Sequence, residues 1–123
     1  MSMYATQAEY QTLAQAITCA PKFQNMLYQC AWLYSCYDGT RRDVDAYMAE
    51  HKTNRPTKER ERMQIQCSRA FGEFWATLQC LHMVAEAFGP IHTGTIHDEI
   101  IELSDGHDTI RRRRELLTRA NAC

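Results

Sequence analysis

Histidines and carboxylates gather near the carboxyl end of this 123-residue chain, in a pattern that could bind a metal ion. Within twelve residues the sequence contains His97, Asp98, Glu99, Glu102, Asp105, His107 and Asp108. Imidazole and carboxylate groups are common metal ligands in enzymes. The chain lacks, however, both H-E-x-x-H and the Glu-x-x-His pairs of carboxylate di-iron bundles. A metal-dependent enzyme is therefore the third function class, and we expect no cofactor.

Six cysteines raise the question of thiol chemistry. Their spacing is irregular, no C-x-x-C occurs, and Cys30, Cys67 and Cys80 fall within apolar helical patterns. We expect these thiols to be reduced and buried, where they are inert as nucleophiles. The sequence also lacks G-x-S-x-G, a Walker loop and a dinucleotide-binding fingerprint. These absences predict a non-enzymatic protein.

Basic side chains form two blocks, over residues 52–62 and 111–114. The first contains Arg60 and Arg62, and the second is the run Arg111, Arg112, Arg113 and Arg114. If both blocks met on one surface they could contact phosphates, so a nucleic-acid-associated helical protein is the alternative function. The net charge of −1 argues against it, because dedicated nucleic-acid binders are usually basic. Residues 76–110 carry six acidic and no basic residues.

An aromatic row suggests a contact surface for another protein. Tyr28 and Trp32 lie on a different face of their expected helix from its main apolar stripe. The row is either buried, within the monomer or in a homodimer, or it binds a protein partner. We add to this candidate surface the four-arginine run, Arg60 and Arg62, and the acidic residues Asp98 and Glu102, which could imitate phosphates.

These features together favour a non-enzymatic protein-binding module. Small helical chains of this kind are frequent among phage and mobile-element proteins, and some of those inhibit host defence complexes, including CRISPR effectors. An inhibitor of that type, similar in role to an anti-CRISPR protein, is the specific form of the expectation. The identity of the protein partner does not follow from the sequence.

The elements that must position these residues are helices. Only five Gly and three Pro occur, and no run alternates apolar and polar residues as a strand does. We expect an all-α fold, a single compact bundle of five to six helices over residues 1–123. The first helix is predicted over residues 7–19, beginning with the capping sequence Thr6-Gln7-Ala8-Glu9. The second runs from Pro21 to Asp38-Gly39, and a short third one covers residues 41–51.

One long central helix is predicted over residues 57–88. Its apolar positions alternate steps of four and three, as in a coiled-coil seam: Cys67, Phe71, Phe74, Leu78, Leu81, Ala85 and Phe88. A helix of this length would span about 48 Å, longer than a bundle of this size. It must therefore kink, with Gly72 as the candidate position, or project from the bundle. Residues 96–120 form two helices broken near Gly106, or a single kinked one.

No apolar stretch approaches the about 20 residues that a membrane-spanning helix needs. The amino-terminal residues also lack the basic and apolar segments of a signal peptide. With reduced cysteines, these features predict a cytoplasmic protein with no membrane partner.

Overall fold

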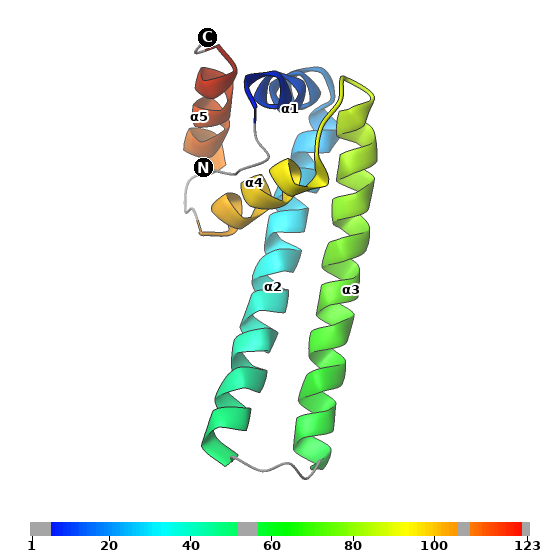
Figure 1. Ribbon diagram of the computed structural model, residues 1–123, viewed down its shortest axis with the longest axis vertical. Coiled ribbons are helices and arrows are strands. Elements are labelled where there is room, and N and C mark those ends of the chain that lie inside the picture. Colours follow the sequence, from blue (N-terminus) through cyan, green and yellow to red (C-terminus); the bar gives the residue numbers. More distant parts are fainter. Residues whose placement is uncertain (1–5, 52–56, 106–108, 122–123) are drawn as a thin grey trace.

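Two long antiparallel helices form the body of the molecule, and three shorter helices gather at one end of them (Figure 1). This computed structural model describes residues 6–51, 57–105 and 109–121, with only the backbone for 109–113. The helices are α1 (Gln7–Cys19), α2 (Pro21–His51), α3 (Lys58–Glu86), α4 (Thr93–Asp105) and α5 (Thr109–Asn121). The expected all-α bundle is confirmed. None of these helices has the length and apolar composition required to cross a membrane.

Side-chain caps fix where α1 and α3 begin. The Thr6 hydroxyl accepts a hydrogen bond from the Glu9 backbone N–H at 3.2 Å, and Thr57 accepts one from Arg60 at 3.0 Å. Each cap satisfies a backbone donor that has no partner inside the helix. The sequence therefore predicts the bounds of α1 correctly and the start of α3 to within one residue.

The predicted break at Asp38-Gly39 is wrong, because α2 continues through it to His51. Asp38 accepts ion pairs from Arg41 at 2.5 Å and from Arg42 at 2.8 Å, which join the turns on both sides of Gly39. The Thr40 hydroxyl donates to the Tyr37 carbonyl at 2.8 Å and so caps no new helix. These local interactions offset the low helix propensity of one glycine.

The apolar core lies where all five helices meet. Its fully buried side chains include Leu13, Phe23, Phe74, Leu78, Leu81, Ile96 and Ile100, and α5 adds Leu116 and Ala120. Phe74, Leu78, Leu81 and Ala85 belong to the predicted coiled-coil seam, so that half of the seam is confirmed as core. We call the part of the molecule around this core the head.

The outer half of the α2–α3 hairpin has no core of its own. The buried residues of α2 all precede residue 32, and those of α3 all follow residue 73. Figure 1 shows both helices continuing side by side, well beyond the head. The helix is longer than the bundle because it projects beyond it. The alternative, a kink at Gly72, does not occur, since α3 continues straight through this residue. We call residues 32–51 and 58–73 the outer hairpin.

Gly89 ends the turn after α3 with a backbone that other residues rarely adopt. Its φ is +155°, and a Cβ placed there would lie 2.9 Å from the Thr12 hydroxyl oxygen. The chain then returns across α2 as α4, which begins at Thr93, three residues before the predicted start. The structure has two helices, α4 and α5, where one kinked helix was the alternative; Gly106 itself lies outside the described residues.

Arg119 joins α5 to α4 through two carboxylates. Its guanidinium contacts buried Glu99 at 2.8 Å and Glu102 at 3.4 Å. It also donates to the Tyr10 hydroxyl at 3.1 Å and lies 5.1 Å from the centre of that ring. A charge inside a protein is tolerated when it is paired and hydrogen-bonded in this way.

We predict that Arg119→Ala lowers the free energy of unfolding by about 2 kcal/mol, because Glu99 loses a charged partner in a buried site. Arg119→Lys should lower the free energy of unfolding by less, since lysine keeps the positive charge but lacks the planar guanidinium that contacts both carboxylates. Arg114→Ala, an exposed change on the same helix, is the matched control and should leave stability unchanged. Urea denaturation measures all three; equal stability of Arg119→Ala and wild type would contradict the role of this cluster.

Candidate protein-binding surface

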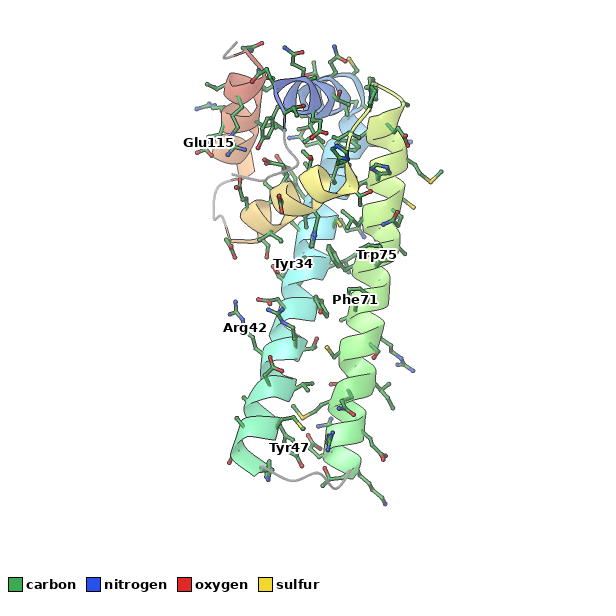
Figure 2. All side chains as sticks on the ribbon, viewed as in Figure 1. Tyr34, Arg42, Tyr47, Phe71, Trp75 and Glu115 are labelled. Atoms are coloured by element: carbon green, nitrogen blue, oxygen red, sulfur yellow. The ribbon has the colours of Figure 1, made fainter. Side chains whose placement is uncertain are left out.

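A chain of aromatic rings connects the core to the surface where the hairpin leaves the head. Phe74, only 2% exposed, lies 5.2 Å from the Tyr34 ring, edge to face. Tyr37 lies 5.2 Å from Phe71, which stacks on Trp75 at 6.0 Å and 17°. Figure 2 shows Tyr34 and Trp75 at one level of the hairpin, with Phe71 nearer the hairpin tip. Burial raises the pKa of the Tyr34 hydroxyl, which therefore stays neutral.

Beside these rings an open groove separates the outer parts of α2 and α3. Its volume is about 600 Å³, and its lining consists of Tyr37, Val44, Gln64, Cys67, Ser68 and Phe71. Cys67 and Phe71 are the first two residues of the predicted seam. This part of the seam lines a groove open to solvent, whereas the part farther along α3 forms the core. Phe71 is 42% exposed, because no helix of the head reaches this level to cover it.

One side of α3 carries exposed side chains without charge along most of its length. Ile65 is 56% exposed, Trp75 45% and Met83 71%, and exposed Ser68, Gly72 and Ala76 lie between them. Positions 65, 68, 72, 76 and 83 are separated by three, four or seven residues, which places them on one side of the helix, and Trp75 lies at the edge of that side. Charged residues border this side, since Glu61 and Arg69 line a shallow surface hollow together with Ile65 and Ser68. We call this set of six residues the α3 outer face.

The aromatic row expected on α2 is divided by the structure. Trp32 is 67% exposed, as a contact residue would be. Tyr28 is half-buried against the core, and its hydroxyl accepts a hydrogen bond from the Gln24 amide at 2.8 Å. Trp32 therefore offers the larger free surface of the two, and the assignment of both to a partner stays a prediction.

The described parts of the two basic blocks lie at opposite ends of the molecule, and residues 52–56 of the first block lie outside those parts. Arg60 and Arg62 are near the start of α3, at the hairpin tip, whereas the four-arginine run belongs to α5 in the head (Figure 1). Arg62 pairs with Glu59 at 2.5 Å, and this carboxylate raises the pKa of Arg62. Arg114 is exposed; the side chains of residues 111–113 lie outside the described part. One chain therefore does not bring the blocks together into a single basic surface.

The acidic residues expected to imitate phosphates have different surroundings. Glu102 lies in the Arg119 cluster, at 3.4 Å from the guanidinium, so it helps to hold the fold. Asp98 is half-buried on α4. Within the described residues, no group of three or more potential metal ligands comes together; His107 and Asp108 of the expected cluster lie outside that part.

Among the five cysteines that the structure describes, the expectation of buried thiols is correct only for Cys30, and Cys123 lies outside the described residues. Cys30 is fully buried, whereas Cys19, Cys36 and Cys80 are exposed and Cys67 is half-buried. Cys80 is exposed because it lies between seam residues, on the solvent side of α3. Burial raises the pKa of the Cys30 thiol to about 12, which keeps it protonated and unreactive.

No protein-family model, curated protein or solved structure matches this chain. The candidate surface therefore depends on geometry alone. Sequence reasoning missed Ile65, Trp75 and Met83, although a signal exists. Positions 65, 68, 72 and 75 repeat the spacing of the core seam on another side of the same helix, which marks Ile65 and Trp75 but not Met83.

We predict that a thiol reagent labels Cys19, Cys36 and Cys80 in the folded protein but leaves Cys30 unlabelled. Raising the pH from about 7 to about 10 should not make Cys30 reactive while the protein stays folded. The pKa of its thiol in the folded protein exceeds the ordinary value of 9.0, so the thiol stays protonated. Labelling Cys30 should require denaturant. Peptide mass spectrometry measures each site, and labelling of Cys30 as fast as Cys80 would refute its burial.

Proposed function

We propose that this chain is a non-enzymatic protein-binding module and that exposed side chains of α3 carry its binding surface. One observation supports this most directly: α3 projects beyond the core and exposes Ile65 and Phe71 there, with exposed Trp75 where the helix leaves the head. Large apolar side chains gathered on an exposed surface favour association, since their burial releases water. Tryptophan is also enriched among residues that dominate binding energy.

The large apolar side chains of the α3 outer face support a protein partner in particular. The centres of protein–protein interfaces are depleted in charged residues and enriched in aromatic and apolar ones. A nucleic-acid surface has the opposite character, because phosphates require arginine and lysine. The separation of the two basic blocks within one chain also weakens the nucleic-acid alternative.

An inhibitor of a host defence complex is one specific form of this proposal. The hairpin is suited to such a role because it can insert into a groove of a larger assembly while the head stays outside. This form depends on the frequency of small helical inhibitors among phage and mobile-element proteins, and partner identification tests it.

We predict that Ile65→Ser and Trp75→Ser each reduce recovery of a protein partner at least about tenfold, as expected for central interface residues. The measurement is quantitative mass spectrometry of proteins retained by the immobilised chain from a host-cell lysate, with differently tagged copies included. Melting temperatures should stay within a few degrees of wild type, because both positions lie outside the core.

Trp32→Ala is the matched control, since it removes an equally large exposed side chain away from the α3 outer face. Recovery lost with Trp32→Ala, and retained in the two α3 variants, would place binding on the aromatic row of α2 instead. If no protein is retained specifically by wild type, the proposed function is wrong.

We also expect no binding to arbitrary duplex DNA at about 50 mM salt, where proteins that neutralise several phosphates bind strongly. A mobility shift that weakens steeply as salt increases would favour the nucleic-acid alternative.

A further inference from the structure

We propose that α5 is a displaceable latch. It occupies a groove of the head that binds an amphipathic helix carrying an arginine, and it opens as one unit while the other four helices stay folded. The latch concerns a different surface from the α3 outer face, so it does not depend on the proposed function. The walls of the groove, the attachment of α5 and the charge of α5 support it.

The groove under α5 is formed by three other helices. A space of only about 10 Å³, the volume of one water molecule, remains beneath Leu116. Its other lining residues come from α1, α2 and α4: Ile17, Gln24, Leu27, Tyr28, Glu99 and Leu103. We call these six residues the α5 groove. Both α1 and α4 pack against α2 and α3, so the walls of this groove are held by contacts that do not involve α5.

Apolar burial holds α5 less firmly than it holds the other short helices. Of the eight residues 114–121, whose side chains the structure describes, Leu116 and Ala120 are buried. The helix α1, by comparison, buries seven of its thirteen residues. Since hydrophobic burial is the main favourable term in folding, α5 is the element of the head that opens at the lowest cost.

The remaining attachment of α5 is polar and lies near its carboxyl end. The side-chain amides of Gln7 and Gln11 donate to the carbonyls of Arg119 and Ala120, in the last turn, where carbonyls lack partners inside the helix. Water can replace these donors when α5 leaves. It can also hydrate the carboxylate of Glu99, which lines the α5 groove and pairs with Arg119 at 2.8 Å. The opened head therefore contains no unpaired buried charge at this position.

The charge of α5 opposes its own helix. The thirteen residues include five arginines and a single acidic residue, Glu115. Arg111 and Arg112 lie in the first turn, where the positive end of the helix dipole disfavours cations. A helix of this length is also marginal in water without tertiary contacts. Once α5 leaves the groove it should therefore lose its helix, which makes opening an event of the whole unit.

The opened groove has a definite preference for what replaces α5. Its apolar floor, which includes Ile17, Leu27 and Leu103, accepts a leucine, and Glu99 accepts a guanidinium. A helix with leucine and arginine three residues apart presents both on one face, as α5 does with Leu116 and Arg119. In the closed protein α5 excludes such a helix from the groove.

Hydrogen exchange of the full chain, followed amide by amide with nuclear magnetic resonance, tests the opening. Amides of residues 114–120 should report one common opening equilibrium, at least about a hundredfold more populated than the opening that exposes residues 74–81. Protection of α5 equal to that of α3, or a graded loss of protection from Asn121 inward, would overturn the latch.

A labelled synthetic peptide of residues 109–121, added to the full chain, tests the groove by fluorescence anisotropy. Wild type should bind it weakly, because the apparent dissociation constant increases with the ratio of closed to open chains. Arg119→Ala in the chain weakens the latch but leaves the groove intact, so this variant should bind the peptide at least about tenfold more tightly. The same substitution in the peptide should weaken binding to this variant by about tenfold.

Arg114→Ala in the chain is the matched control, because it removes an exposed arginine of α5 and should leave peptide binding unchanged. A second variant acts in the opposite direction, so that general unfolding cannot imitate it. Arg111→Glu places an anion in the first turn of α5 and should slow exchange of residues 114–120 by roughly two- to fivefold. Faster exchange in this variant would count against the latch.

The decisive outcome is the comparison of Arg119→Ala with wild type. If this variant binds the peptide no more tightly than wild type does, α5 is a fixed part of the core and the inference is wrong. None of these measurements involves Ile65 or Trp75. The latch and the proposed function can therefore fail independently of each other.

Discussion

The size of the core limits everything else in this molecule. Three short helices cover the inner halves of α2 and α3, but each long helix extends about 45 Å, and the outer halves continue without cover. Hydrophobic burial is the main favourable term in folding, so the head supplies most of the stability. The outer hairpin is present because each of its helices continues one that the head has already fixed.

Polar contacts complete the head where apolar packing alone would leave its elements loosely joined. Thr95 donates to the Glu9 carboxylate at 2.5 Å and thus ties α4 to α1, while the Gln11 amide donates to the Ala120 carbonyl at 3.1 Å and ties α1 to α5. Buried carboxylates joined to hydroxyl or guanidinium donors fix the relative positions of these short helices. The rigid head then determines the direction in which the hairpin projects.

Periodicity and capping residues were sufficient to predict the helices, but burial was not predictable from them. The bounds of α1 and the seam of α3 follow from local signals, since a cap and a repeat act within a few residues. The helix end predicted at Gly39 is wrong, because the ion pairs that Asp38 forms across the glycine outweigh the low helix propensity of one residue. Phe71 and Phe74 occupy the same seam, yet only Phe74 is buried; the difference depends on how far α4 reaches, which is a tertiary property. For the same reason, sequence alone found Trp32 as a surface candidate and missed Trp75.

The projecting hairpin also implies a gradient of local stability along one continuous pair of helices. Amide groups near Phe74 are protected by the cooperative core, and protection should decline toward His51 and Lys58, where helix propensity and local ion pairs alone resist opening. A partner that binds the outer hairpin must then supply part of the energy that orders it. The affinity for such a partner therefore depends on temperature and on the helix propensity of residues that do not contact the partner. Substitutions at exposed positions such as Gly39 can change the affinity by changing the stability of the hairpin.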